Sequence, residues 1–384
     1  MQKLNPDTLR IILMFLLWQV ALVIVLIFAI NFIPLQYKDR FLGGGYINHQ
    51  LAPELFSWAN FDGEHYLAIA IFGYKEREQA FFPVYPGMIS FLAKPFSPDL
   101  LSFLVNSTIA GLVISNLSFL LALMILWNLI TIDYSKKIAL FTLAAILLFP
   151  TSFYFGAVYS ESLFLLLSVS SFYLARKRHW FSASFLGAVA SATRVFGVLL
   201  LVALLIEAWE QKAKLSKSFW IFLIPSGLLI YMFYQYFTVG DPLAFYNLQG
   251  QVGEQHQSGL VLLPQVFFRY AKMLLTVDSG QLIYKTVILE FLVGLIFFLL
   301  PIYGYFKKMR LSYLTYAMLG FLLPSLTGSF SSVPRYVTVL FPSFLIMAVI
   351  INKLPNLLRI IILSFSALVL MVETALFLRG YWVA

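Results

Sequence analysis

The sequence predicts an all-α polytopic membrane protein, and its composition and hydropathy lead to this expectation. Of 384 residues, 61% are hydrophobic and only 11% are charged, whereas a soluble domain carries about 25% charged residues. Uncharged runs with the roughly 20 residues needed to cross a bilayer recur along the chain, at residues 11–33, 100–132, 138–160, 219–239 and 312–334. The chain contains no cysteine, which excludes disulfides and thiolate chemistry.

Basic residues predict how these helices are oriented. Lysine and arginine gather in short loops, at residues 136–137, 176–178, 212–217, 307–310 and 353–359. If these loops are cytoplasmic, the positive-inside rule places the N-terminus inside and the segment around Asp62 outside. The net charge of +9 is dispersed among the loops and does not indicate binding to nucleic acid.

The N-terminal half begins with a crossing at residues 11–33 and continues into a long first outer loop, residues 34–99. Loops above about 15 residues are usually functional, and this one combines three consecutive glycines with apolar patches such as "PELFSWANF". We expect it to carry short helices that lie in the membrane interface. Helices at residues 103–131, 138–155 and 158–175 follow.

Residues 181–206 allow two topologies. A single crossing would place the basic loop at 212–217 outside, whereas two half-membrane helices meeting near Thr193 and Arg194 would keep both flanking basic loops inside. Each half of about 12 residues would reach about 18 Å, roughly to mid-membrane. The charge pattern favours this re-entrant hairpin, and broken helices are tolerated where they line a polar cavity.

The C-terminal half contains a helix at residues 219–238 and a second outer loop at 239–280. Further helices are expected at residues 282–305, 312–328, 336–351 and 358–378. The total is about nine to eleven crossings. No internal repeat, soluble domain or low-complexity tail interrupts the pattern, so residues 1–384 are expected to form a single membrane domain.

The stretch "NFDGEHY" places Asp62, Glu64 and His65 within four residues of a chain that is poor in charge. Ionisable groups at membrane depth cost roughly 2.5–3.5 kcal/mol each and are functional candidates. A carboxylate here can act as a general base toward a hydroxyl nucleophile. Asp62 is equally suited to cap a helix that begins near Gly63. The three residues form an incomplete set of ligands for a divalent cation.

Two further charged residues stand in apolar surroundings. Glu161, in "GAVYSES", is expected at the outer start of a helix, where the helix dipole stabilises a carboxylate. Beside Tyr159 and Ser160 it is also suited to bind sugar hydroxyls. Arg194 lies near mid-membrane and must meet an anion or a group of carbonyls. Bidentate phosphate recognition suits arginine, and a structural ion pair with Glu161 is the alternative.

The remaining polar positions are less specific. Arg335, in "SSVPRY", is a second candidate phosphate ligand, although it is also placed to snorkel toward lipid headgroups. Asp241, in "GDPLAFY", is polar on the outer side but stands in a typical turn sequence. "AFFPVYPG" forms either a wall of a site or an interfacial aromatic belt. Glu290 and Glu373 lie inside predicted helices with no motif around them, and we assign them no role.

Together these residues predict an outward-facing cavity at the membrane surface that contains carboxylates and two arginines. Such a cavity suits a lipid-linked phosphate, which the arginines would hold while a carboxylate activates the acceptor. A sugar that arrives on a lipid needs no soluble nucleotide site. The absence of a Gly-rich phosphate loop of the P-loop or Rossmann type agrees with this chemistry.

The sequence resembles the PIG-V-like mannosyltransferases, which comprise the GPI second mannosyltransferase family and its bacterial relatives. Six stretches over about residues 55 to 345 carry the resemblance in order: "NFDGEHYLAIAIFGY", "QAFFPVYP", "YSESLFLLLS", "SATRVFG", "GDPLAFY" and "SVPRYVTVLFPSF". The resemblance implies a GT-C bundle, a polyprenyl- or dolichyl-phosphate sugar donor, mannose as the favoured sugar, and transfer on the outer or luminal face. Without large luminal insertions, the chain is more similar to a bacterial inner-membrane relative with a different acceptor.

The resemblance implies that Asp62 is the catalytic base, and chemistry suggests the other roles. Arg194 and Arg335 are expected to bind the donor phosphate. The residues expected to bind the acceptor or the sugar are Glu64, His65, Tyr159, Glu161 and Asp241. The residues alone leave open whether Asp62 or Glu64 is the base. No cofactor is required; a divalent metal is compatible with these residues but is not predicted.

Two other classes of function remain as alternatives. A polytopic transporter or flippase for a lipid-linked or anionic substrate would use the same intramembrane charges, but often shows an inverted repeat or paired broken helices. A non-catalytic subunit of a glycosylation complex would tolerate neutralisation of Asp62. The expected partners of the enzyme are the lipid-phosphate sugar donor, a lipid- or glycan-linked acceptor and membrane lipids.

Overall fold

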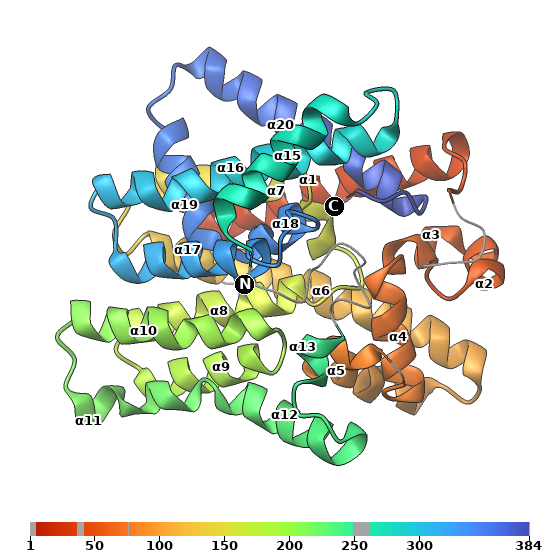
Figure 1. The fold of residues 1–384 in the computed structure, drawn as a ribbon, viewed down its shortest axis with the longest axis horizontal. Helices are drawn as coiled ribbons and strands as arrows, with labels where there is room; N and C mark the ends of the chain where they lie inside the picture. The colour runs from red at the N-terminus through yellow and green to blue at the C-terminus, as the bar shows by residue number, and fades with distance from the viewer. Residues whose placement is uncertain (1–4, 37–41, 76, 249–260, 384) are drawn as a thin grey trace.

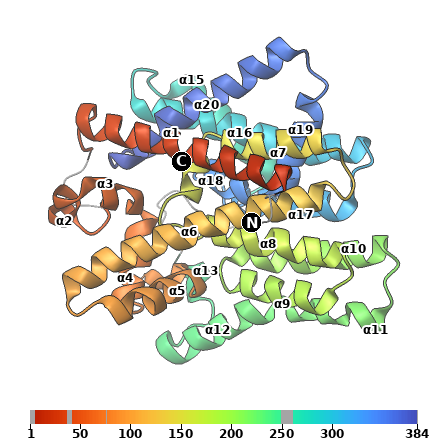
Figure 2. The same cartoon turned by 180° about the vertical axis from the view of Figure 1, so that it is seen from behind.

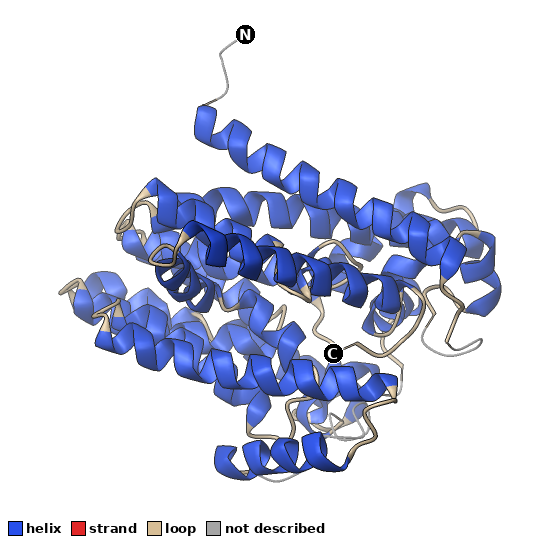
Figure 3. Cartoon of the chain, turned by 90° about the horizontal axis from the view of Figure 1, so that it is seen from above, coloured by secondary structure: helices blue, strands red, loops and turns tan. Residues whose placement is uncertain are grey.

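The computed structural model describes residues 5–36, 42–75, 77–248 and 261–383, so parts of both expected outer loops lie outside the described residues. All regular secondary structure in these ranges is helical (Figure 1). The view from above shows the helices packed in layers, with the N-terminal end of the first helix projecting from the bundle (Figure 3). The all-α architecture predicted from hydropathy is therefore confirmed.

Five helical segments among the described residues are long and apolar enough to cross a membrane, and a sixth crossing results if one bent pair counts as a span. They are α1 (Pro6–Phe32), α6 (Leu100–Ile130), α16 (Leu282–Phe306), α20 (Asn356–Leu378) and the segment Leu215–Val239. Large apolar side chains such as Leu17 and Ile230, each 70% exposed, cover their outer faces. Such a surface is suited to lipid rather than to water.

The other expected crossings correspond to shorter helices. These are α7 (Lys136–Leu147), α8 (Glu161–Arg176), α9 (Trp180–Ser191), α10 (Leu199–Glu210), α17 (Leu311–Ser325) and α19 (Phe341–Ile351). Seen from behind, α6 runs along the bundle and packs against α8, while α1 packs against α20 (Figure 2). The core is built where these short helices meet.

Three of the predicted helices are wrong in extent or continuity. The helix expected at 138–155 ends at Leu147, because Pro150 cannot continue it, and residues 152–155 form a separate 3-10 turn. The helix expected at 336–351 is a bent pair: residues 333–339 and α19 meet at 87°. Leu340 has non-helical dihedral angles there, and Pro342 is the second residue of the new helix, a position that suits proline.

The expected helix at residues 219–238 is also broken. It consists of α11 (Leu215–Ser218), a 3-10 turn at Phe219–Leu223 and α12 (Ser226–Val239), with Pro225 at the start of α12. The remaining helices follow the prediction within five residues at either end.

Residues 180–210 form a helical hairpin rather than a single crossing. Helices α9 and α10 are antiparallel and meet near Arg194 (Figure 1). The ends of the two helices away from Arg194 are adjacent, since Arg178 Nη2 donates to the carbonyl oxygen of Gln211 at 3.4 Å and Gln211 Nε2 donates to that of Ala175 at 3.0 Å. The hairpin favoured by the charge pattern is what the structure contains.

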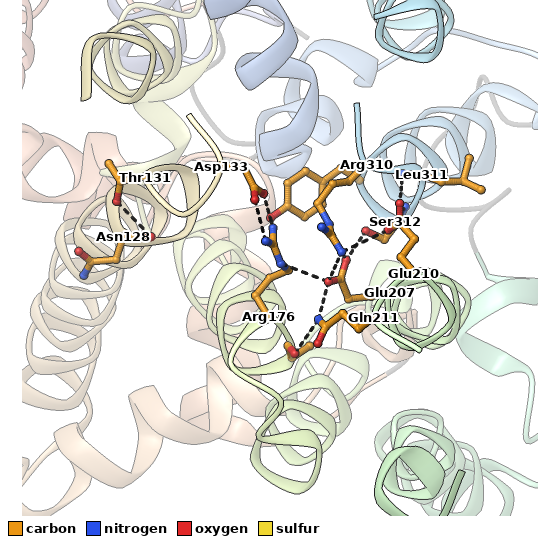
Figure 4. Close-up of polar contacts among 12 residues, drawn as sticks. Asn128, Thr131, Asp133, Arg176, Glu207, Glu210, Gln211, Arg310, Leu311 and Ser312 are labelled. Atoms are coloured by element: carbon orange, nitrogen blue, oxygen red, sulfur yellow. Dashed lines mark hydrogen bonds and ion pairs between the residues drawn. The ribbon is translucent and has the colours of Figure 1, made fainter. Parts of the chain in front are cut away.

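Buried ion pairs connect the open end of this hairpin, the end away from Arg194, to neighbouring helices (Figure 4). Glu207 on α10 is fully buried and pairs with Arg176 of α8 at 3.2 Å and with Arg310, which precedes α17, at 2.7 Å. Arg176 also pairs with Asp133, which follows α6. Breaking a buried pair leaves an uncompensated charge, so these contacts fix the relative positions of α6, α8, α10 and α17.

The segment expected as the first outer loop carries short helices. They are α2 (Tyr46–Leu51), α3 (Pro53–Phe56), α4 (Asp62–Phe72) and α5 (Val84–Ala93). In the segment expected as the second outer loop, α13 (Ala244–Asn247) and α15 (Leu263–Thr276) are the described helices, and α18 (Val333–Tyr336) precedes α19. Helix α4 packs against α5 and α6, which brings its N-terminus to the end of the bundle where α8 begins.

Candidate active site

Four charged side chains from distant parts of the sequence meet at this end of the bundle: Asp62, Glu161, Arg194 and Arg335. Arg335 Nη1 lies 2.7 Å from Asp62 Oδ2, and its Nε lies 3.3 Å from Glu161 Oε1. Arg194 Nη1 lies 2.5 Å from the same Glu161 oxygen. We call these residues the Glu161 cluster, because Glu161 joins its two arginines. The structure therefore brings together four of the predicted site residues.

Asp62 is the most accessible member of the Glu161 cluster. Its side chain is 26% exposed, whereas that of Glu161 is 1% exposed. The two guanidinium side chains are 10% and 11% exposed. A substrate hydroxyl can therefore approach the Asp62 carboxylate more easily than the Glu161 carboxylate. This difference in exposure favours Asp62 as the proton acceptor and gives Glu161 an internal, charge-balancing position.

The backbone around Asp62 is tightly specified. Phe61, which precedes α4, has a φ of 58°, an unusual value for a residue with an aromatic side chain. Val158 N donates to the carbonyl oxygen of Trp58 at 2.9 Å, and a Cβ atom added to Gly63 would lie 3.3 Å from the carbonyl oxygen of Val158. These contacts dock the start of α4 directly against the segment that leads into α8.

The capping alternative for Asp62 does not match the structure. Asp62 is the first residue of α4, Phe61 occupies the N-cap position, and the cap makes no side-chain hydrogen bond. The Asp62 carboxylate points instead to Arg335. A negative charge in the first turn is still favourable for the helix dipole.

Glu161 and Arg194 occupy the ends of their elements. Glu161 is the first residue of α8, and Arg194 lies at the tip of the α9–α10 hairpin. Arg194 Nη1 also donates to Ser160 Oγ at 3.3 Å, and Ser160 shares a 2.9 Å hydrogen bond with the hydroxyl of Tyr66. The ion pair proposed as the alternative for Arg194 is therefore present. A guanidinium has five N–H donors, so this pair leaves others to bind a phosphate.

Aromatic rings surround Arg335. Its guanidinium carbon lies 5.6 Å from the ring centre of Tyr154, 5.5 Å from that of Tyr159 and 5.0 Å from that of Tyr336. Cation–π contacts of this kind stabilise a partly desolvated guanidinium. Sequence reasoning missed Tyr154 and Tyr336, although the position of Tyr336 directly after Arg335 was an available signal.

Glu64 and His65 follow Asp62 on α4. The His65 ring is stacked on Phe81 at 4.8 Å between ring centres, and Phe81 also packs edge-on against Tyr66 at 5.3 Å. The "AFFPVYPG" stretch thus forms an aromatic wall beside α4. Glu64 is half-buried, and this burial raises its pKa to about 7. A carboxyl with such a pKa can exchange protons near neutrality.

Tyr159 and Asp241 make hydrogen bonds within the protein. Tyr159 is buried, and its hydroxyl donates to the carbonyl oxygen of Asn60 at 2.8 Å. Asp241 accepts hydrogen bonds from the backbone N–H of Leu243 at 2.9 Å and from Asn247 Nδ2 at 2.8 Å, as expected for a turn. Asp241 makes no described contact with the Glu161 cluster, whereas Tyr159 supports it through Arg335.

No group of three or more histidine, aspartate or glutamate side chains in the described ranges could hold a metal ion. Asp62, the member of the "DGEH" sequence that pairs with an arginine, already has a cationic partner.

Comparison with known proteins shows the family. Residues 8–247, more than half of the chain, match the family "Mannosyltransferase (PIG-V)". The chain therefore belongs to this family. A comparison with curated proteins finds no significant match.

Two solved structures have a similar fold. ArnT from Cupriavidus metallidurans bound to undecaprenyl phosphate superposes with a TM-score of 0.55 at 13% identity, over 93% of this chain and 63% of the ArnT chain. The apo state of the same protein gives a TM-score of 0.53 at 14% identity, over 91% and 61% of the two chains. The chain thus spans about three fifths of the length of ArnT. At this identity the likeness shows a shared GT-C fold.

Proposed function

We propose that this member of the mannosyltransferase (PIG-V) family transfers a sugar, with mannose favoured, from a polyprenyl-phosphate-linked donor to a hydroxyl group of a lipid- or glycan-linked acceptor. The observation that carries the proposal is the Glu161 cluster. In it the accessible Asp62 carboxylate lies 2.7 Å from Arg335, which also pairs with Glu161. The presence of undecaprenyl phosphate in the similar ArnT structure supports a donor of this lipid class.

In the proposed reaction Asp62 is the general base. The acceptor hydroxyl hydrogen-bonds to its carboxylate, and the hydroxyl oxygen attacks the anomeric carbon while its proton passes to Asp62. The bond between the anomeric carbon and the phosphate oxygen breaks, and the electron pair leaves with the polyprenyl phosphate. The configuration inverts, since attack and departure occur on opposite faces of the sugar.

Arg194 and Arg335 would stabilise the negative charge that develops on the leaving phosphate. Without substrate, Arg335 pairs with Asp62. A donor phosphate would compete for the guanidinium of Arg335 and would release the Asp62 carboxylate to accept the acceptor proton. Glu64, His65 and the aromatic wall at Phe81 lie beside Asp62 along α4, and we assign to them the binding of the acceptor or sugar.

The reaction is assayed as transfer of labelled mannose from undecaprenyl-phosphate mannose by purified protein in lipid, with a lipid extract as the acceptor pool. Asp62→Asn is compared with wild type, with Glu64→Gln and with Asp99→Asn as a matched control. Asp99 caps α6, and asparagine caps a helix as well as aspartate. We expect Asp62→Asn to lower the rate by about 10²–10⁴-fold, the usual contribution of a general base.

The outcomes separate the alternatives. Loss of transfer in Glu64→Gln with full transfer in Asp62→Asn would make Glu64 the base. Equal transfer by all variants would refute a catalytic carboxylate on α4. If wild-type protein transfers nothing, the proposed donor is wrong and a transporter for lipid-linked or anionic substrates becomes the better explanation. Thermal stability, measured in parallel, distinguishes lost chemistry from lost folding.

We further propose that the active site faces outward, across the inner membrane of a bacterium. The basic segments near Arg178, Lys212 and Arg310 meet at the open end of the hairpin, which is the opposite end from Arg194. Positive-inside orientation then places the Glu161 cluster on the outer side. Because the chain lacks cysteine, single substitutions test this directly. In intact cells an impermeant maleimide should label Ser279→Cys but not Lys212→Cys, and the reverse pattern would refute the orientation.

A further inference from the structure

The position of Arg335 depends on the preceding loop, residues 328–332. Gly328 and Ser332 both have positive φ angles in this loop, 97° and 60°. A left-handed conformation is unfavourable for a residue with a side chain and persists when surrounding contacts enforce it. Ser332 occupies the N-cap position of α18, and its carbonyl oxygen accepts from Arg335 N at 3.0 Å. The conformation of Ser332 therefore sets the direction in which Arg335 leaves the loop.

Glu290, a buried residue of α16, enforces this conformation. Its Oε1 accepts a hydrogen bond from the backbone N–H of Ser332 at 3.3 Å, and its Oε2 accepts one from the hydroxyl of Tyr270 at 2.6 Å. The Tyr270 hydroxyl also lies 3.2 Å from Ser329 Oγ, which in turn accepts from Ser331 N at 3.0 Å. Both Glu290 oxygens therefore act as acceptors. One of them binds Ser332 directly, and the other binds Tyr270, which contacts Ser329, so the carboxylate holds both ends of the turn from residue 329 to 332.

The same loop is held from its other side by the segment around α15. This helix buries Val266 and Tyr270 and carries Arg269. Arg269 Nη1 donates to the carbonyl oxygen of Gly328 at 3.0 Å, and Val261 N donates to that of Leu326 at 2.9 Å. The loop before Arg335 is therefore clamped between α15 and α16, with Glu290 at the centre of the contacts.

We propose that Glu290 is a positioning residue of the active site. It holds Ser332 in its left-handed conformation and thereby places the Arg335 guanidinium between Asp62 and Glu161. Glu290 itself makes no described contact with the Glu161 cluster, so it acts through the loop. The consequence for catalysis rests on the proposed function, in which Arg335 binds the phosphate of the donor lipid.

Two measurements test the proposal in the full-length protein in lipid. The first is amide hydrogen exchange of residues 328–336, followed by mass spectrometry, which requires no substrate. The second is the affinity for undecaprenyl phosphate. Glu290→Ala should accelerate exchange in this segment and weaken lipid binding by about tenfold or more, the effect of losing a hydrogen bond to a charged group. Glu290→Gln keeps an acceptor oxygen for Ser332 and should retain most of the affinity.

Adding Ser332→Gly to Glu290→Ala provides the decisive rescue, because glycine adopts a positive φ without steric cost. This double variant should recover much of the lost affinity, which a general loss of stability would not allow. Glu373→Ala is the control: Glu373 is equally buried, but it pairs with Lys285 at 2.7 Å and not with the loop. If Glu290→Ala does not fold, Tyr270→Phe removes one contact and should act in the same direction.

Unchanged exchange and affinity in Glu290→Ala, an equal loss in Glu373→Ala, or no rescue by Ser332→Gly would overturn the proposal. If wild-type protein does not bind undecaprenyl phosphate, the proposed donor is wrong. The exchange measurement then decides the positioning role alone: faster exchange that Ser332→Gly reverses supports it, and unchanged exchange refutes it.

Discussion

Neutralising Glu161 should destabilise the protein more than any single substitution at an exposed carboxylate. Its side chain is 1% exposed and accepts ion pairs from both Arg194, at 2.5 Å, and Arg335, at 3.3 Å. In Glu161→Gln both guanidinium groups would lose their shared anion. Removing one partner of a buried ion pair costs about 3–5 kcal/mol. For a chain of this size such a loss corresponds to a decrease in Tm of about 4–6 °C.

The assay is thermal unfolding in lipid nanodiscs, with Glu373→Gln as the matched control. Glu373 is also 1% exposed, but its ion-pair partner among the described residues, Lys285, is 28% exposed and can turn toward solvent. We therefore expect the control to lose less stability than Glu161→Gln. The double variant Glu161→Gln/Arg194→Gln should lose less than the sum of its single variants, because one stranded guanidinium is removed with its partner. A Glu161→Gln protein as stable as wild type, or an additive double variant, would refute the electrostatic account of the cluster.

Three further predictions concern other parts of the fold. Burial raises the pKa of Glu64 from 4.5 to about 7, so the folded state binds the proton of this carboxyl more tightly than the unfolded state does. The contribution of protonated Glu64 to the free energy of unfolding is full below pH 4.5 and is lost as pH rises to about 7. The Tm of wild type should therefore fall more than that of Glu64→Gln between these pH values, and parallel curves would contradict this. Glu207→Gln should lower the free energy of unfolding by about 3–5 kcal/mol, since Glu207 is the buried partner of two arginines. A decrease below about 1 kcal/mol would contradict this. Gly197→Ala should weaken the hairpin tip, because the added Cβ would lie 2.3 Å from Ser191 N, and native-like Tm and activity would show that the tip can relax.

Hydropathy predicted the class of fold, and the charge pattern favoured the hairpin over a single crossing, before any contact was known. An uncharged run must cross or enter the membrane because of its composition, whatever it packs against. Two basic loops on the same side of the membrane would require residues 181–206 to turn back, and the structure contains a hairpin there. The candidate residues Asp62, Glu161, Arg194 and Arg335 were also identifiable singly, because charge is costly in such surroundings.

The sequence could not show which of these charges would meet. Asp62 and Arg335 are separated by 273 positions, and their 2.7 Å contact results from the docking of α4, α8 and α18 at one end of the bundle. The extent of α7 and the break before α19 were missed for another reason: hydropathy treats these apolar runs as continuous, although Pro150 and Pro342 interrupt them. Glu290 had no motif around it, since its partners lie on α15 and in the loop before Arg335.

The sequence by itself therefore determined which segments lie in lipid and which charged residues need a bonding partner. Both follow from the transfer free energy of individual side chains, which is a local property of the chain. What only the tertiary structure decided is the choice of partners: Arg335 for Asp62, Glu161 for Arg194, and Ser332 for Glu290. Ion pairs and hydrogen bonds depend on distances of a few ångströms, and those distances are set by helix packing between segments far apart in the sequence.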